Sequence, residues 1–230
     1  MGAQLVMSSS ISAAWFRLFP GPKIPDVLVY MSDTWSSLLQ TSPSAISFEK
    51  DEPTLTDNLC EALSDEDRRF DWGMDCDFQA ETWELRRAAN GDVSRIARAD
   101  IRVILGAPGT PHLVLEFKKL DGSASSKWKY CFDGLNRFID GKYAVGHEYG
   151  IMCAFSPLDL IKEAGDLARY IASADYPKRL NCIPAPNGDV AVSPSMMGGQ
   201  VHFDTSHFRI TQNPSLPIVI LHTLLPCPVV

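Results

Sequence analysis

The order of apolar and polar positions predicts where the first core helix of this chain lies. Leu55, Leu59 and Leu63 recur at helical spacing on one stripe, which indicates a helix over Thr54–Leu63. Pro53 suits the first turn of such a helix, because the N–H that proline lacks would have no partner there. The sequence therefore predicts that the folded core opens with a helix.

Runs of β-branched and apolar residues predict the strands. Asp100–Leu105 alternates between the two faces of a strand, and Tyr149–Phe155 is a short apolar run typical of a buried strand. The strands expected are Phe78–Arg86, Asp100–Leu105, His112–Leu120 and Tyr149–Phe155, with further ones at Val190, Val201–Ile210 and Ile218–Leu225. The acidic stretch Ser64–Asp77 and residues 89–92 and 106–110 are expected to be loops and turns.

Two more helices are expected between and after these strands. Apolar positions from Trp128 to Ile139 recur at helical spacing, and Gly141 is placed to cap that helix. Pro157–Ser173 is the other expected helix. The core order is therefore α-β-β-β-α-β followed by additions, which predicts an α/β fold.

Residues 1–50 are loosely patterned, rich in serine and proline, and poor in charge. We expect them to form an N-terminal arm that packs on the domain or on a partner. Residues 51–230 are expected to be one domain, with a core at about 51–156 and a C-terminal extension of β additions at 157–230. The aromatic and aliphatic residues Trp15, Phe16, Leu18 and Phe19 are candidate docking anchors, and the alternative is that they fold back onto the core.

Composition narrows the class of protein. Hydrophobic residues make up 45% of the 230 residues, which is enough for a sizeable core. No apolar run reaches the roughly 18 residues that cross a bilayer, so no membrane contact is expected. The six cysteines form no CxxC pair, and Cys131 and Cys153 fall in apolar runs. Reduced, buried thiols in a cytoplasmic protein are the expectation.

Charge is unevenly distributed along the chain. The net charge is −7, but residues 51–81 alone hold eleven acids and two arginines and carry −9. The remainder is slightly basic, which leaves room for a nucleic-acid surface without requiring one. We expect weak DNA affinity for the isolated chain and a partner that supplies basic surface.

The strongest chemical signal lies in the expected hairpin centred on Pro108. Its register places Asp100 directly opposite Glu116, at a Cβ separation of about 5 Å. Two facing carboxylates repel, and a divalent cation relieves that repulsion, because Mg²⁺ favours one or two carboxylates together with water and phosphate oxygens. Lys118 lies two residues beyond Glu116 on the same strand face. There its charge could stabilise an attacked phosphate.

Ala99-Asp100-Ile101-Arg102-Val103 followed by Leu115-Glu116-Phe117-Lys118 resembles the D…ExK signature of the PD-(D/E)XK (restriction-endonuclease-like) nuclease superfamily. The resemblance covers roughly residues 50–156 and implies an αβββαβ core, with a mixed sheet flanked by helices. It also implies that Asp100, Glu116 and the carbonyl of Phe117 bind Mg²⁺ or Mn²⁺, with Lys118 as the catalytic lysine.

Many members of that superfamily add a catalytic glutamate from the first helix, which would help to hold the metal, and two positions qualify here. Glu52 precedes Leu55 by three residues and shares its stripe, whereas Glu61 points roughly the other way. We favour Glu52. Either residue could instead be an ordinary solvated helix acid.

A second resemblance, to some defence-associated members, involves segments farther along the chain. It rests on Gly134-Leu135-Asn136-Arg137-Phe138, on Gly141-Lys142-Tyr143-Ala144 with Gly150-Ile151-Met152, and on Ser206-His207-Phe208-Arg209 with Leu221-His222-Thr223. It implies that these segments lie near the active site. The candidate nucleic-acid contacts are Lys119, Lys129, Tyr130, His207 and Arg209. The histidines could equally be hydrogen-bonded structural residues.

Two functions remain open at this point. The first is a Mg²⁺- or Mn²⁺-dependent nuclease that hydrolyses phosphodiester bonds in DNA, as the nuclease subunit of a bacterial antiphage defence complex. The second is a nuclease-like subunit without catalysis, which docks a partner ATPase or helicase, or nucleic acid. Intact Asp100, Glu116 and Lys118 favour the first.

Overall fold

The structure, a computed structural model, describes residues 19–87, 93–106, 112–144, 146–210 and 217–229. The helices are α2 (Ile24–Thr41), α3 (Glu52–Leu63), α4 (Glu66–Asp71), α5 (Ala124–Lys129), α6 (Asn136–Ile139), α7 (Leu160–Ile171) and α8 (Tyr176–Arg179), with short 3₁₀ turns at Gly21–Lys23 and Pro43–Ala45 and a π-helical turn at Tyr130–Leu135. The strands are β1 (Cys76–Arg87), β2 (Val93–Leu105), β3 (His112–Lys119), β4 (Tyr149–Ser156), β5 (Ala191–Val192), β6 (Phe203–His207) and β7 (Ile218–Pro226). The expected order α-β-β-β-α-β is present.

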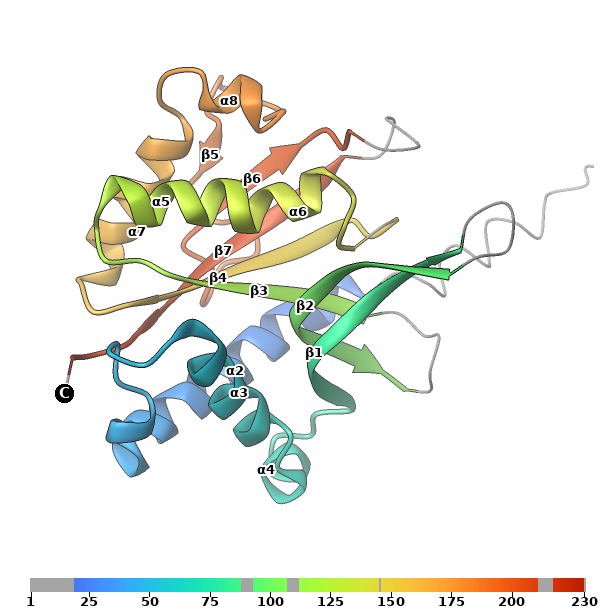
Figure 1. Cartoon of the computed structure of the whole chain (residues 1–230), viewed down its shortest axis with the longest axis vertical. Coiled ribbons are helices and arrows are strands. Elements are labelled where there is room, and N and C mark those ends of the chain that lie inside the picture. The colour runs from blue at the N-terminus through green and yellow to red at the C-terminus, as the bar shows by residue number, and fades with distance from the viewer. Residues whose placement is uncertain (1–18, 88–92, 107–111, 145, 211–216, 230) are drawn as a thin grey trace, which may run out of the picture.

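The described strands form one seven-stranded mixed sheet in the order β1-β2-β3-β4-β7-β6-β5 (Figure 1). The first three strands are antiparallel neighbours, whereas β4 runs parallel to both β3 and β7. The crossover from β3 to β4 is the helical segment from Ala124 to Ile139, called here the α5–α6 segment. The predicted α/β class with a mixed sheet flanked by helices is therefore confirmed.

The register of the β2–β3 hairpin is the predicted one. Ile101 pairs with Leu115 and Val103 pairs with Leu113. Continued by one residue, this register places Asp100 opposite Glu116. The turn expected at 106–110 and the one expected at 89–92 lie mostly outside the described residues.

Two hydrophobic cores lie on opposite faces of the sheet. One packs α2 and α3 against odd-numbered positions of β3, such as Leu115 and Phe117. The other packs the α5–α6 segment and α7 against the opposite face, which includes Val114 and Met152. Because side chains alternate along a strand, Glu116 and Lys118 share the second face with Val114. The α5–α6 segment covers that face of the sheet (Figure 1).

The later part of the expected arm is a helix in the core. In α2 the side chains of Tyr30, Met31 and Trp35 are fully buried, and Trp35 Nε1 donates to the carbonyl of Pro226 at 2.6 Å. Phe19 is also buried. Residues 19–50 therefore pack on the domain. Trp15, Phe16 and Leu18 lie outside the described residues.

The expectation for the acidic stretch is wrong. Ser64–Asp77 is not a loop throughout, because it contains α4 and the start of β1. Asp65 caps α4 by accepting from the N–H of Arg68, a local bond that does not depend on an apolar stripe.

All six cysteines are free thiols, and Cys131 and Cys153 are buried as expected. In the described part of the chain, no helix has the length and apolar character needed to span a membrane.

Candidate active site

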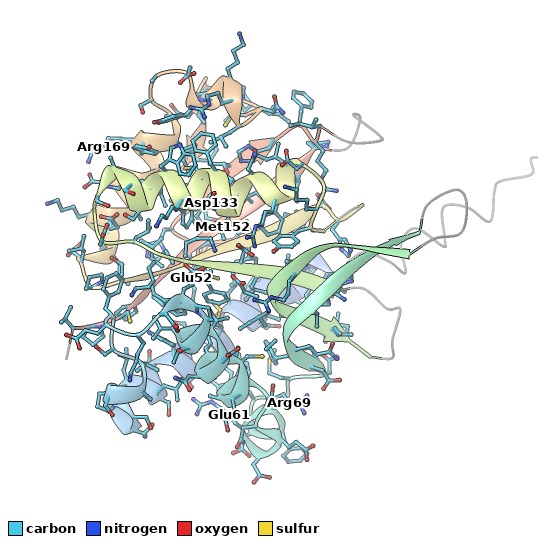
Figure 2. All side chains as sticks on the ribbon, in the orientation of Figure 1. Glu52, Glu61, Arg69, Asp133, Met152 and Arg169 are labelled. Carbon is cyan, nitrogen blue, oxygen red and sulfur yellow. The ribbon has the colours of Figure 1, made fainter. Side chains whose placement is uncertain are left out.

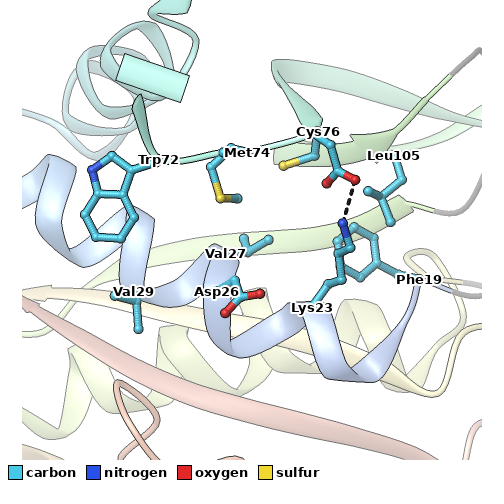
Figure 3. A pocket seen from close by; sticks show the side chains of 11 residues that line it. Phe19, Lys23, Asp26, Val27, Val29, Trp72, Met74, Cys76 and Leu105 are labelled. Carbon is cyan, nitrogen blue, oxygen red and sulfur yellow. Dashed lines mark hydrogen bonds and ion pairs between the residues drawn. The ribbon is translucent and has the colours of Figure 1, made fainter. Parts of the chain in front are cut away.

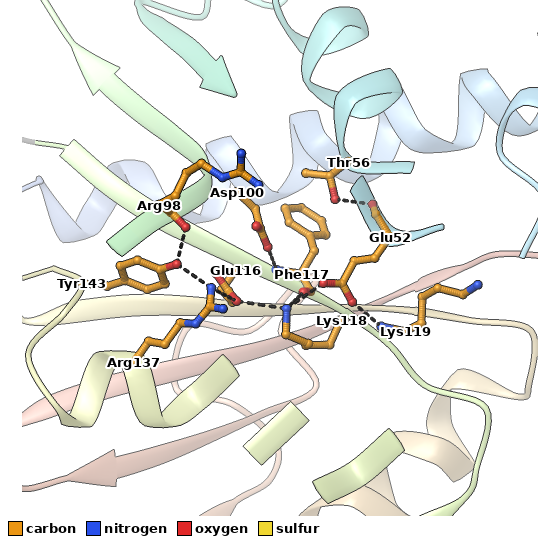
Figure 4. A network of polar contacts seen from close by, with 10 residues as sticks. All are labelled: Glu52, Thr56, Arg98, Asp100, Glu116, Phe117, Lys118, Lys119, Arg137 and Tyr143. Carbon is orange, nitrogen blue, oxygen red and sulfur yellow. Dashed lines mark hydrogen bonds and ion pairs between the residues drawn. The ribbon is translucent and has the colours of Figure 1, made fainter. Parts of the chain in front are cut away.

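The β2–β3 hairpin, the N-terminus of α3 and α6 bring acidic and basic side chains together (Figure 4). Asp100 Oδ2 accepts a hydrogen bond from the backbone N–H of Phe117 at 2.7 Å, which fixes its carboxylate beside β3. Glu116 is fully buried. Burial, followed by the neighbouring Asp100 charge, raises the pKa of Glu116 to about 7. Burial also raises the pKa of Asp100. The facing pair of acids that the hairpin predicts is thus present in a poorly solvated setting.

Lys118 lies where oxygen atoms from three residues converge. Its Nζ is 2.6 Å from the carbonyl oxygen of Phe117 and 3.0 Å from Glu116 Oε1. The third contact, at 2.7 Å, is with Glu52 Oε1. The ammonium group is buried and bound on several sides, so its position is well defined.

The N-terminus of α3 delivers Glu52 to this cluster. Asp51 caps the helix by accepting from the N–H of Thr54 at 2.9 Å, and Pro53 occupies the first turn. Glu52 then binds Lys118 through Oε1 and the backbone N–H of Lys119 through Oε2, at 3.1 Å.

Glu61, the alternative helix acid, is placed elsewhere. It is exposed at the other end of α3, toward α4 (Figure 2). It lines a different groove together with Arg68. The structure therefore brings Glu52, and not Glu61, to the hairpin acids.

Arg137 is a fifth charged group in the cluster and was not among the expected site residues. Its Nη1 donates to Glu116 Oε1 at 2.9 Å and to the hydroxyl oxygen of Tyr143 at 2.7 Å. Tyr143 in turn donates to the carbonyl of Arg98 on β2. Arg137 thus ties α6 to Glu116 on β3, and Tyr143 links Arg137 to β2.

Sequence reasoning named the segment that carries Arg137 but gave the residue no role. The signal that could have marked it is Gly134, three residues earlier. A Cβ at Gly134 would lie 2.7 Å from Met152 Cε and 3.4 Å from Lys118 Cγ. A side chain at Gly134 would force the end of Met152 to move, and the π-helical turn at Tyr130–Leu135 is a feature common at functional sites.

One oxygen of the cluster has no partner. Glu116 Oε1 accepts from both Lys118 and Arg137, but Glu116 Oε2 is buried without a hydrogen bond among the described residues. A buried acceptor left unbonded costs about 1–3 kcal/mol, more when it is charged. Such an atom is a natural ligand for a cation.

The residues present fit a hard divalent cation. Among the described residues, no group of three or more His, Cys, Asp and Glu side chains is arranged to hold a metal ion. Mg²⁺ does not need one, because it is often held by one or two carboxylates and completes its shell with water and phosphate oxygens. Asp100, Glu116 Oε2 and the carbonyl of Phe117 provide that donor set.

The cluster borders a groove with a cavity volume of about 610 Å³. Its lining residues are Glu52, Lys118, Lys129, Phe132, Asp133, Asn136, Arg137, Asp140 and Lys142. Four of these are basic and three are acidic. The groove is therefore mixed in charge and open to a polar substrate.

Of the expected nucleic-acid contacts, only Lys129 is exposed on the groove. Lys119 is engaged by the N-terminal part of the chain, since its Nζ donates to the carbonyls of Phe48 and Lys50 at 2.6 and 2.7 Å. Lys119 therefore holds the segment before α3 in place.

The assignments of Tyr130, His207 and Arg209 to a nucleic-acid surface are corrected. Tyr130 and His207 are fully buried, and Arg209 is 6% exposed. The Arg209 Nη2 donates to the carbonyl of His147 at 2.7 Å. Burial lowers the pKa of Arg209 to about 10. Only His207 lies on a strand, at the end of β6; Tyr130 lies in the π-helical turn and Arg209 lies two residues beyond β6. The sequence pattern did not show that these side chains are covered.

Tyr130 and His207 belong to a buried chain of hydrogen bonds, called here the histidine chain, formed by Tyr130, His222, Thr205 and His207. Tyr130 Oη lies 2.8 Å from His222 Nδ1, and His222 Nε2 lies 2.8 Å from Thr205 Oγ1. Thr205 Oγ1 is 2.7 Å from His207 Nε2, and His207 Nδ1 is 2.7 Å from the carbonyl of Leu180. Burial lowers the pKa of His207 to about 4.

A second cavity, of about 180 Å³, lies near the N-terminal side of α2 (Figure 3). Its lining is largely apolar, with Phe19, Val27 and Trp72 among the residues, and its ion pair joins Lys23 Nζ to Asp75 Oδ2 at 2.5 Å. That pair is exposed and has no buried acid beside it in the lining. The groove beside Glu116 is the stronger candidate for chemistry.

Comparison of the chain with protein-family models, with curated proteins and with solved structures gives no match.

Proposed function

We propose that this chain is a Mg²⁺- or Mn²⁺-dependent nuclease that hydrolyses phosphodiester bonds in DNA, with a PD-(D/E)XK-like core. The observation that supports this most strongly is Glu116. It is buried and faces Asp100, and it keeps one unbonded oxygen beside a lysine. A fold built for stability alone avoids this arrangement, because a buried acceptor atom left without a hydrogen bond is costly.

Each residue has a distinct part in such a reaction. Asp100, Glu116 and the Phe117 carbonyl would hold the metal, which when bound activates water and stabilises charge on the phosphate. Lys118 would bring its positive charge to the attacked phosphate or the water. Glu52 positions Lys118 by accepting from its ammonium at 2.7 Å.

The test is DNA cutting by the purified chain, on a supercoiled plasmid and a short duplex. Cutting should require Mg²⁺ or Mn²⁺ and stop in EDTA. Asp100→Ala, Glu116→Ala and Lys118→Ala should each abolish it. Glu52→Gln should lower it strongly, while Glu61→Gln serves as a control in the same helix and should not. Wild-type rates in all three alanine variants would refute the nuclease assignment.

A second candidate, a nuclease-like subunit without catalysis, is favoured by one observation. Glu116 Oε1 already has two internal cations, Lys118 and Arg137, within 3.0 Å. A cluster neutralised in this way could serve as structure alone. Mn²⁺ binding distinguishes the two candidates: a chain that neither cuts DNA nor binds Mn²⁺ at this site fits the second.

In either case we propose a larger protein partner, such as an ATPase or helicase, in an antiphage defence complex. The charge of the groove and of the whole chain supports this proposal. The groove is nearly balanced between acids and bases, and the net charge of −7 disfavours tight binding to a polyanion. Tight DNA binding by the isolated chain at ~150 mM salt, where screening is already strong, would remove the need for that partner.

A further inference from the structure

The wall of the groove opposite Glu52 carries a feature that metal binding does not explain. Arg137 extends from α6 with its side chain 36% exposed, while Nη1 is held between Glu116 and Tyr143. Among the described residues, both hydrogen bonds of this guanidinium are made by Nη1. Neither Nε nor Nη2 of Arg137 is a buried unbonded atom. The Nε–Nη2 edge therefore remains accessible beside the groove.

We propose that Arg137 forms a phosphate-binding subsite that takes one backbone phosphodiester of the nucleic acid, and that Tyr143 is its positioning residue. Two N–H groups on one edge of a guanidinium match two phosphate oxygens, so a bidentate contact fits. This subsite rests on the proposed function, because it assigns that groove a substrate class.

The backbone around Arg137 is built to hold the side chain still. The carbonyl of Arg137 accepts from the N–H groups of Lys142 and Tyr143, at 2.8 and 3.2 Å. This closes the turn after α6 directly onto Arg137, and Gly141 supplies the positive φ of 63° that the turn requires. The hydroxyl of Tyr143 then accepts from Nη1. Arg137 is therefore held both at its backbone and at its guanidinium group.

Position also separates this subsite from the expected metal ligands. Arg137 shares the groove wall with Lys129 and Lys142, and Lys142 is partly offset by Asp140 at 3.5 Å. Arg137 has its own acidic contact, Glu116, on the opposite edge of its guanidinium. Arg137 would therefore lie between a phosphate on its Nε–Nη2 edge and Glu116.

The test uses short fluorescent duplexes, each with one phosphate replaced by a neutral methylphosphonate, and measures binding in EDTA at low ionic strength. For wild type, one position should weaken binding about tenfold or more, as expected for a lost charge-assisted bond. Arg137→Met should lose sensitivity at that same position, and Arg137→Lys should keep part of it. Arg169→Met, an exposed arginine on α7, is the matched control and should keep the wild-type profile.

Tyr143→Phe separates positioning from structure. It removes the hydroxyl group that joins Arg137 to Arg98 and should reduce the position-specific sensitivity several-fold while leaving the melting temperature within a few degrees. If Arg137→Met keeps the wild-type methylphosphonate profile, or if no position matters for wild type, the subsite is refuted. Binding is measured without cutting, so the two proposals can fail separately. If the protein does not cut DNA but Arg137→Met loses the position-specific sensitivity, the nuclease proposal is refuted and the phosphate subsite is supported.

Discussion

Two polar networks lie beneath the same α5–α6 segment, and they differ in how completely their polar atoms are hydrogen-bonded. In the histidine chain every donor meets an acceptor. His207 must donate from Nδ1 to a carbonyl, so its Nε2 accepts from Thr205, Thr205 accepts from His222, and His222 accepts from Tyr130. In the candidate site, by contrast, Glu116 Oε2 is left over.

This difference in pairing indicates a structural role for the histidine chain and a binding role for the candidate site. A neutral, fully paired and closed network adds stability and fixes one arrangement of the core. A charged network that keeps an unpaired buried oxygen, and that borders an open groove, is costly unless something binds there. Variants of the two networks should therefore have opposite effects on stability and on activity.

The largest effect is expected from Glu116→Gln. Losing the carboxylate removes the anionic donor to a metal, so DNA cutting should fall by about 1,000-fold or more. The melting temperature should hold or rise, because the variant no longer buries an acid whose pKa is raised to about 7. Plasmid cutting and calorimetry on the same preparation measure both. A large loss of stability would place Glu116 with the structural network.

Thr205→Val should show the reverse pattern. It leaves His207 Nε2 and the N–H of His222 unpaired in the core, so the free energy of unfolding should fall by about 2–5 kcal/mol. Activity per folded molecule should stay unchanged. Urea denaturation gives the free energy, and Thr54→Val, at an exposed threonine, is the control. Activity that falls in proportion to the folded fraction agrees with this; a further loss contradicts it.

The histidine chain also predicts a pH dependence. His207 has its pKa lowered from 6.5 to about 4 by burial, so below pH 6.5 the unfolded chain binds a proton that the folded chain does not. Stability should therefore be complete above pH 6.5 and fall by up to about 3 kcal/mol as the pH drops to 4. His207→Gln should flatten this part of the curve of unfolding free energy against pH. An unchanged slope would assign the effect to other groups.

The smallest effect concerns Lys118. Its ammonium contacts the Phe117 carbonyl and Glu116, two of the expected metal donors. Lys118→Met should therefore bind Mn²⁺ more tightly, by about tenfold at pH 8, although it cannot cut DNA. Calorimetric titration with Mn²⁺ measures this. Lys119→Met, whose ammonium contacts the Phe48 and Lys50 carbonyls, should match wild type. Weaker binding by Lys118→Met would show that the lysine supports the site.

Some of this architecture follows from local sequence alone. Strand alternation places Glu116 and Lys118 on one face, and the hairpin register places Asp100 opposite Glu116, because both depend on neighbouring residues and one short turn. Helix phase is also local, so the stripe through Leu55 separates Glu52 from Glu61. The helical pattern of α2 is also present in the sequence, since its buried residues share one helical face: Val27, Tyr30, Met31 and Trp35. The serines, threonines and prolines around these residues made that pattern hard to recognise.

Only the tertiary structure decided the rest. A strand pattern shows which face a side chain takes but not what covers that face. Here His207 is buried against the carbonyl of Leu180, and Arg209 is buried against the carbonyl of His147. The site itself joins elements that are distant in sequence: Glu52 binds Lys118 across 66 positions, and Arg137 binds Glu116 across 21. Such pairings depend on how a helix crosses the sheet, and at that crossing Gly134 packs against Met152 and Lys118.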